Sequence, residues 1–334
     1  MSTLPASFRA YVVDRPAGGA FTRGVRDLAL ADLPWGEVTV RVEWSSVNFK
    51  DGLAAREDGR VARSYPLVPG IDLAGTVVES EDPAIEVGSP VLANGYDLGT
   101  ARHGGYAELA RIPSGWVVPQ PDGLTAREAM EIGTAGFTAA MSVVALEERG
   151  LRPGDGPVLV TGASGGVGST AVAILAARGH EVWAATGKPD EATRLRDLGA
   201  AGILPREEVT GPGRPLESTR WAGAVDTVGA ATLSYVLRTL RIGAAVASSG
   251  NASGAELATT VFPFILRGVA LLGMDSGNMA IEPRRALWRR LATDLLPRGI
   301  GDRIREVDLD TLESALDAIV AGAARGRWVV RVAG

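Results

Sequence analysis

The chain has 334 residues, of which 46% are apolar and 22% charged, a globular composition that excludes a disordered or collagen-like chain. Its net charge of −5 and the lack of any block of basic residues argue against a nucleic-acid-binding surface. With no cysteine and two histidines, the sequence excludes disulfides, thiolate nucleophiles and a cysteine- or histidine-rich metal site.

The first 125 residues are rich in strand signals. Val38, Val40 and Val42 alternate with polar neighbours, which is the period of a half-buried strand. Pro-Gly, Asn-Gly and Gly-Gly pairs punctuate this segment at short intervals. From Thr125 the pattern changes to that of helices that end at Gly150.

Strands and helices then alternate, which is typical of a parallel, doubly wound sheet. The predicted strands are 157–162, 181–186, 223–229 and 243–250, and the predicted helices are 165–179, 191–199 and 230–240. The last 40 residues or so hold a helix at 311–326 and a strand at 327–332. At about 100–200 residues per domain, the length predicts two or three domains, and the order of elements favours a Rossmann domain inserted near the C-terminal end of a β-rich domain.

No apolar run is long enough to cross a membrane. The nearest stretch, Val261–Met274, is interrupted by Pro263 and Arg267. The N-terminal residues lack an apolar core before a small-residue cleavage site. We therefore expect a cytoplasmic protein with no membrane partner.

The strand at 157–162 runs directly into a glycine loop, residues 162–168 (Gly-Ala-Ser-Gly-Gly-Val-Gly), and then into a helix. A side chain at these glycines would keep a pyrophosphate away from the backbone N–H groups, and the helix N-terminus favours negative charge. Because a second strand follows, this context favours dinucleotide binding over a purely structural turn.

The end of the second strand should select the cofactor. An NAD site expects an acid about 20 residues after the loop, whereas residues 185–188 read Ala-Thr-Gly-Lys. Thr186 and Lys188 could hold a 2′-phosphate, so the sequence favours NADPH; the alternative is that Lys188 is a solvated surface charge. Asp190 and Glu191 are interpreted as first-turn acids of the next helix.

Short-chain dehydrogenases have a similar loop, but near the N-terminus and with a downstream Tyr-x-x-x-Lys pair. Here Tyr235 is the only tyrosine after the loop, and Thr239 stands where the lysine would be. That chemistry is therefore excluded.

With the loop in the middle of the chain, the sequence resembles the medium-chain dehydrogenase/reductases over essentially its whole length. Zinc-dependent members carry Gly-His-Glu after a proline, whereas residues 69–72 here are Pro-Gly-Ile-Asp. The resemblance is thus to zinc-free members, and no metal is expected. Several strings resemble the acrylyl-CoA reductase type of quinone oxidoreductase-like proteins: 45–54, 65–77, 132–147, 160–173, 221–229 and 263–276.

This resemblance implies an α/β fold with a GroES-like β-rich catalytic domain at 1–126 and 297–334 and a Rossmann domain at 127–296. It also implies NADPH-dependent reduction of a 2-enoyl thioester, acrylyl-CoA to propionyl-CoA, by a homodimer. Hydride would reach the β-carbon while negative charge develops on the thioester oxygen, where fixed donors lower the barrier.

The resemblance places the loop at residues 48–51 over the nicotinamide. Asn48 and Lys50 are candidate donors to the developing oxyanion, and Asp51 could pair with Lys50. Phe49 stands where relatives commonly have tyrosine, so it cannot protonate the substrate and water is a candidate proton source. Alternatively, Asn48 and Asp51 only hold the loop through backbone hydrogen bonds.

The other cofactor contacts are implied by the resemblance alone. The pyrophosphate group comprises Ser164, Gly165, Gly166 and Val167. The ribose-phosphate group comprises Thr186, Gly187, Lys188 and Arg206, whose guanidinium suits a phosphate. The nicotinamide half would be approached by Phe49, Asn251, Ile265, Ser276 and Arg327, the last of which could also be an ordinary surface arginine.

Two other functions stay open, because a fold cannot choose a substrate. One is an NADPH-dependent reductase of quinones or free enals and enones, and the other is a non-catalytic NADPH sensor. Arg56, Arg60 and Arg63 could meet CoA phosphates, but Glu57 and Asp58 between them favour a solvated loop.

Overall fold

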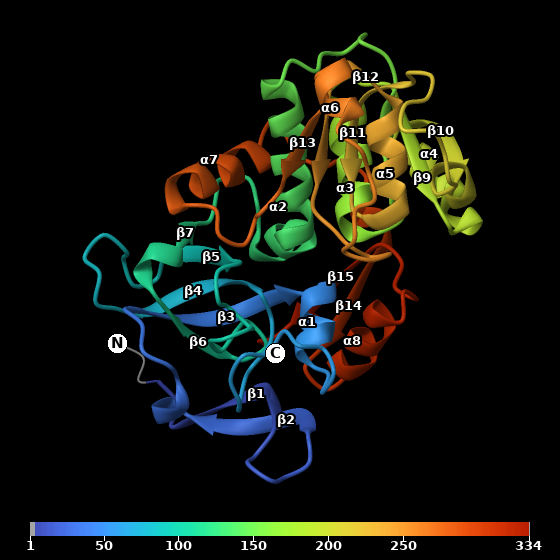
Figure 1. The fold of residues 1–334 in the computed structure, drawn as a ribbon. Coiled ribbons are helices and arrows are strands. Elements are labelled where there is room, and N and C mark those ends of the chain that lie inside the picture. Colours follow the sequence, from blue (N-terminus) through green and yellow to red (C-terminus); the bar gives the residue numbers. More distant parts are fainter. Residues whose placement is uncertain (1–3, 334) are drawn as a thin grey trace. The chain divides into compact units, whose positions relative to one another are not determined.

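A computed structural model describes residues 4–333, apart from the side chains of 302 and 303. Its contacts divide the chain into two compact units (Figure 1). Unit 1 runs to Thr134 and also contains Gly277–Ala292 and the residues from 303 onward, and unit 2 comprises Ala135–Ser276 and residues 293–302. Residues 277–292, assigned above to the Rossmann domain, pack with unit 1. This division follows contacts, so the domain boundaries at 126/127 and 296/297 stay a prediction.

Unit 1 is built on a mainly antiparallel sheet of seven strands. In spatial order these are β14 (Ile304–Asp308), β15 (Arg327–Arg331), β3 (Val38–Ser46), β4 (Asp72–Ser80), β5 (Pro90–Asn94) and β7 (Val118–Pro119), with β6 (Leu109–Ile112) also on β3. A separate hairpin pairs β1 (Ser7–Asp14) with β2 (Thr22–Ala29). Val38, Val40 and Val42 are fully buried as predicted and Arg41 is exposed, but Thr39 is buried as well, so the alternation is confirmed only in part.

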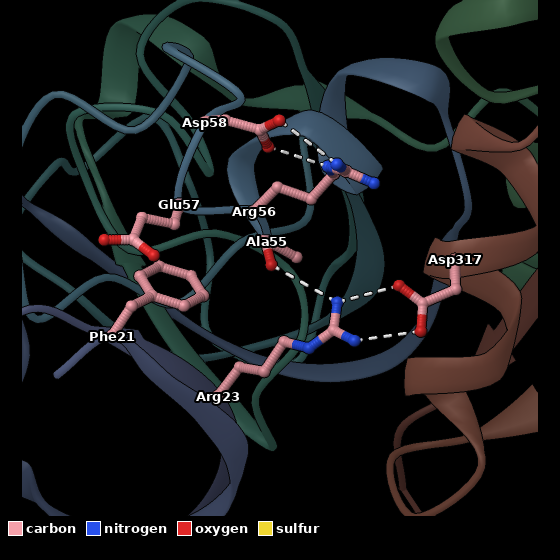
Figure 2. A pocket seen from close by; sticks show the side chains of 7 residues that line it. All are labelled: Phe21, Arg23, Ala55, Arg56, Glu57, Asp58 and Asp317. Carbon is pink, nitrogen blue, oxygen red and sulfur yellow. Dashed lines mark hydrogen bonds and ion pairs between the residues drawn. The ribbon is translucent and has the colours of Figure 1, made fainter.

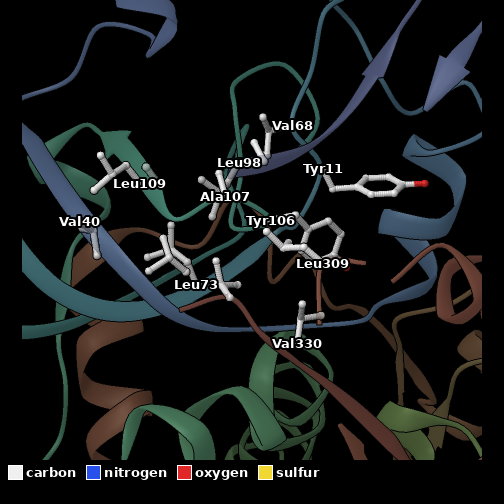
Figure 3. Packing of buried hydrophobic residues seen from close by; sticks show 14 of the residues in the cluster. Tyr11, Val40, Val68, Leu73, Leu98, Tyr106, Ala107, Leu109, Leu309 and Val330 are labelled. Carbon is white, nitrogen blue, oxygen red and sulfur yellow. The ribbon is translucent and has the colours of Figure 1, made fainter. Parts of the chain in front are cut away.

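Short helices complete unit 1. They are η1 (Leu30–Asp32), α1 (Phe49–Ala54), η2 (Ser114–Trp116), α7 (Ile281–Leu291), α8 (Leu312–Val320) and the start of α2 (Ala126–Glu148). The inward faces of the strands and the apolar side of α8 form one core, in which Leu73, Tyr106, Leu309 and Val330 come together (Figure 3). This core holds the strand ends and α1 in place.

Unit 2 contains a six-stranded sheet in which all neighbouring strands are parallel. Its order is β10 (Ala200–Pro205), β9 (Val182–Thr186), β8 (Val158–Val160), β11 (Trp221–Asp226), β12 (Leu240–Ser248) and β13 (Ala270–Gly273). The helices are the rest of α2, α3 (Gly166–Ala177), η3 (Pro189–Glu191), α4 (Ala192–Asp197), η4 (Arg206–Val209), α5 (Ala230–Thr239), α6 (Phe262–Arg267) and η5 (Ile300–Arg303). The doubly wound sheet predicted from the sequence is confirmed, and its strand order reverses between β8 and β11, where such folds bind ligands.

Helix α2 is long and apolar enough to cross a membrane by length and composition, but 78% of its apolar window is buried within the structure. It is therefore interpreted as a core helix. A kink at Gly133 (φ 51°, ψ −163°) divides it into two helical segments. The structure adds elements that the sequence-based assignment lacks, among them α6, α7, β13 and β14.

Candidate functional site

The glycine loop of unit 2 has the geometry of a phosphate cradle. Gly162 has φ +59°, and Gly165 is the exposed residue that precedes α3, a helix of 12 residues. A Cβ at Gly168 would collide with the carbonyl oxygen of Gly162, so the helix approaches the loop as closely as a glycine allows. The first N–H groups of α3 have no acceptor within the helix and carry a partial positive charge. The residues present thus fit a bound pyrophosphate.

The four residues expected at the ribose phosphate come together at the ends of β9 and β10. These strands are neighbours with Thr186 opposite Pro205, which places Arg206 beside Gly187. A Cβ at Gly187 would collide with the Arg206 guanidinium, so only a glycine admits that close approach. Thr186 accepts the backbone N–H of Lys188 at 3.0 Å. The Arg206 guanidinium thus lies beside the segment that carries Thr186 and Lys188, and the predicted role of these residues at a 2′-phosphate stays a prediction.

Three further predicted contacts lie elsewhere in unit 2. Asn251 is exposed beyond the carboxyl end of β12, and its Cα would lie 3.3 Å from a Cβ added to Gly229. Ser276 follows β13, and its hydroxyl accepts a hydrogen bond from Thr138 at 2.8 Å. Ile265 lies on α6 with its side chain 68% exposed. The roles of all three stay predictions.

A buried polar network surrounds Asp72 at the start of β4 in unit 1. One carboxylate oxygen accepts the Asn48 amide at 2.8 Å, the Thr134 backbone N–H at 3.0 Å and the Ser46 hydroxyl. The other accepts the Thr134 hydroxyl at 2.5 Å. The Asn48 amide nitrogen also lies 3.1 Å from the carboxylate of Asp51. Asn48 therefore bridges two buried acids.

Asp51 is fully buried and joins the start of its loop to the segment just before β4. Its carboxylate accepts the backbone N–H groups of Asn48 and Ile71, each at 2.8 Å. Burial, and then the charge of Asp72, raise the pKa of Asp51 to about 7. These contacts support the alternative reading, in which Asn48 and Asp51 hold the loop, and the catalytic assignment of both stays a prediction.

Arg327 belongs to the same network and is not a surface arginine. Its Nε donates to the carbonyl of Glu131 at 2.9 Å and its Nη1 to that of Val47 at 3.4 Å. Its Nη2 is buried without a hydrogen-bond partner, and burial lowers the pKa of the guanidinium. The unsatisfied Nη2 of Arg327 could donate a hydrogen bond to a polar group of a bound ligand. The contact of Arg327 with the nicotinamide half stays a prediction.

Phe49 and Lys50 are the exposed members of this loop. Both lie in the first turn of α1, and the Phe49 ring is 48% exposed. Among the described residues Lys50 forms no ion pair, so of its two alternatives the pairing with Asp51 does not occur: the Asp51 carboxylate accepts backbone N–H groups in the interior instead. Lys50 is therefore available to a ligand.

Comparison with known proteins identifies the family. Two family profiles match, the alcohol dehydrogenase GroES-like domain at residues 34–122 and the zinc-binding dehydrogenase family at 166–293. The acrylyl-CoA reductase AcuI of Ruegeria pomeroyi is 50% identical over 97% of this chain and 99% of its own. The chain belongs to the medium-chain dehydrogenase/reductases.

Two solved structures show the same fold as this medium-chain dehydrogenase/reductase. The YhdH oxidoreductase of Salmonella enterica in complex with NADP has a TM-score of 0.94 at 45% identity, covering 97% of this chain and all of its own. The Bacillus subtilis protein YhfP, provisionally named a quinone oxidoreductase, was solved with NAD bound and has a TM-score of 0.95 at 43% identity, covering 98% and 100% of the two chains. The predicted family and fold are confirmed.

The name of one profile mentions zinc, but this medium-chain dehydrogenase/reductase departs from the zinc-dependent pattern. Ile71 occupies the place expected for the histidine, and its backbone N–H is used by Asp51. Over residues 4–333, leaving out the two undescribed side chains, no three His, Cys, Asp or Glu side chains are grouped to hold a metal ion.

A pocket of about 420 Å³ opens in unit 1 behind α1 (Figure 2). It is lined by Phe21, Arg23, Ala55, Arg56, Glu57, Asp58 and Asp317. Arg23 pairs with Asp317 through two hydrogen bonds of 2.9 Å, and Arg56 pairs with Asp58 through two of 2.9 and 3.1 Å. Because these arginines are neutralised, the pocket suits CoA phosphates poorly, in line with a solvated loop.

Sequence reasoning missed several residues that build the site. Asp72 was read only as part of a motif, and Ser46, Thr134 and Tyr106 were not considered. The Tyr106 hydroxyl donates to the Ser46 carbonyl at 2.9 Å inside the network. The one available signal was an acid two residues after the Pro69-Gly70 pair.

Proposed function

We propose that this protein uses NADPH to reduce the C=C bond of a 2-enoyl thioester, with acrylyl-CoA as substrate and propionyl-CoA as product. The observation that carries the proposal is the identity of 50% to a named acrylyl-CoA reductase across nearly the full length of both chains. The Salmonella relative with NADP bound supports the same cofactor.

The charge at the end of β9 also supports NADPH. Thr186, Lys188 and Arg206 would hold the 2′-phosphate, and Ser164, Gly165, Gly166 and Val167 the pyrophosphate. When bound, NADPH supplies the hydride. The Arg206 guanidinium lies next to Gly187 and can bind a phosphate through two N–H groups.

In unit 1 the first turn of α1 would present Phe49 to the cofactor and Lys50 to the substrate. The Lys50 ammonium can donate to the thioester oxygen as negative charge develops there, a kind of stabilisation worth about 10²–10³ in rate for one donor. Asn48, Asp51 and Asp72 would fix the direction of that turn. The reaction then needs no metal ion or covalent nucleophile from the protein.

Reduction of quinones or free enals is the second candidate, favoured by the name of the Bacillus relative. Inhibition by free CoA distinguishes the two. For a thioester reductase, CoA should compete with the enoyl-CoA and not with NADPH. If CoA leaves turnover unchanged, or competes with NADPH alone, the thioester assignment is wrong.

The assembly and compartment are part of the same proposal. We place the enzyme in the cytoplasm as a zinc-free homodimer with a GroES-like domain at 1–126 and 297–334. The dimer is supported by one edge of the unit 2 sheet: among the described residues β13 pairs with β12 alone, and Leu271 on β13 is 38% exposed. Near it in sequence, Val261, Phe262, Ile265 and Leu266 are also exposed.

A further inference from the structure

Glu191 and Arg194 form a buried ion pair just beyond the strand that carries the ribose-phosphate residues. Arg194 Nε lies 2.6 Å from Glu191 Oε2, and the two side chains are 10% and 2% exposed. Taking both charges out of water is costly, so a buried pair gives no net stability unless its geometry and further hydrogen bonds offset the loss. The position of the pair suggests what it does.

Arg194 reaches back to the glycine loop. Its Nη2 donates to the backbone carbonyl of Ser164 at 3.2 Å. On its other side, the Ser164 hydroxyl accepts the Thr186 hydroxyl at 3.0 Å. Ser164 is thus fixed through both its backbone and its side chain, directly before the exposed N-terminus of α3.

The pair also decides the charge beside the ribose phosphate. The Glu191 backbone N–H donates to the Lys188 carbonyl at 3.0 Å, so the acid lies one turn from Lys188. An unpaired acid near this strand end favours a free ribose hydroxyl and repels a 2′-phosphate, which carries close to two negative charges. Arg194 neutralises Glu191 at short range.

We propose that Arg194 is a positioning and specificity-determining residue for the cofactor. It holds the Ser164 carbonyl, which helps both nicotinamide nucleotides, and it cancels the Glu191 charge, which helps NADPH alone. This inference rests on the proposed NADPH site. In it, Arg194 acts through Ser164 and Glu191 and does not touch the cofactor.

Dissociation constants for NADPH and NADH, measured by fluorescence titration, separate the two effects. Arg194→Met should weaken the binding of NADPH about 30-fold and that of NADH about fivefold, because the tether to Ser164 is lost and the Glu191 carboxylate loses the Arg194 charge. The double variant Arg194→Met with Glu191→Gln should raise the dissociation constants of both nucleotides about fivefold. The ratio of the two dissociation constants should therefore return to that of the wild type. Should the methionine variant fail to fold, Arg194→Lys keeps the charge and should preserve the ratio.

Arg196→Met is the matched control, since Arg196 lies on the same helix with its side chain exposed. The inference is overturned if Arg194→Met behaves as this control does, or if the second substitution does not restore the ratio. The proposed cofactor site itself is wrong if the wild-type protein binds NADPH no more tightly than NADH and if Lys188→Ala changes neither dissociation constant.

Discussion

At the scale of single residues, the two buried acids of unit 1, Asp51 and Asp72, differ in the hydrogen-bond donors that they receive. Asp51 and Asp72 both accept the Asn48 amide, and the nearby Arg327 guanidinium gives its resolved hydrogen bonds to backbone carbonyls. Asp72 receives hydroxyl and amide donors in addition, whereas Asp51 receives mainly backbone N–H groups. Burial with these donors alone, and then the charge of Asp72, raise the pKa of Asp51.

This raised pKa predicts a particular dependence of stability on pH. The pKa of Asp51 is about 7 in the folded protein, against 3.8 for an ordinary aspartate. Between these values the folded state holds more protons, so the free energy of unfolding falls as pH rises through this window. Asp51→Asn removes the titration and should flatten that fall.

Urea unfolding at about pH 5 and about pH 8 measures the effect. The control is Asp122→Asn, which changes an exposed acid of unit 1. The expectation fails if Asp51→Asn and the control show the same pH slope as the wild type.

At the scale of elements, helix α2 shows how a tertiary contact reverses a local preference. Its kink at Gly133 places a left-handed backbone next to the polar network. A Cβ there would lie 2.7 Å from Arg327 Nη2 and 2.8 Å from both Asp72 Oδ2 and Ser46 Oγ. Helix propensity alone favours alanine over glycine by about 1 kcal/mol, but such crowding outweighs it.

Gly133→Ala should accordingly destabilise the protein by about 2–4 kcal/mol, because strain at positive φ adds to the displacement of three buried polar groups. Thermal or urea unfolding gives the value. Gly115→Ala is the control, since a Cβ at Gly115 meets no atom within 4 Å. An unchanged or higher midpoint for Gly133→Ala would show that the kink is not required.

The elements also show what could be predicted from the sequence. The alternation in unit 2 was predictable because buried parallel strands are short apolar runs bounded by glycines. Helix α7 was not, because its buried face contains Arg284 beside Trp288 and breaks the apolar pattern. Arg284 is fully buried and donates to the Asn94 carbonyl at 2.7 Å, an interaction across 190 residues that no local pattern indicates.

At the scale of the whole molecule, the exposed edge of unit 2 is the feature that concerns assembly. An open apolar edge strand is a liability for a protein in solution unless it is covered. Leu271→Arg places a charge on β13 and should shift the protein from dimer to monomer in sedimentation or light-scattering measurements. Val87→Arg, at an exposed apolar residue of unit 1, should leave the dimer intact. A monomeric wild type, or a dimer that survives Leu271→Arg, would contradict the proposed assembly.

Some residues of the candidate site lie close together in the sequence, whereas others come together only in the fold. The glycine loop and the Thr186–Lys188 segment follow their strands directly, so their grouping was predictable from the sequence alone. The network around Asp72 was not, because it joins residues as far apart as Asn48, Thr134 and Arg327. Family resemblance indicated Asn48, Asp51 and Arg327, and only the fold shows that they face inward and meet Asp72 and Thr134.

The most direct test of the account is the rate of NADPH oxidation with acrylyl-CoA, crotonyl-CoA and a simple benzoquinone, compared as kcat/KM. The account predicts a much higher value for acrylyl-CoA than for the quinone, with NADPH preferred over NADH. Turnover with the quinone alone would contradict the thioester assignment and leave the cofactor site standing. Tight NADPH binding without turnover of any acceptor would contradict catalysis of this kind altogether.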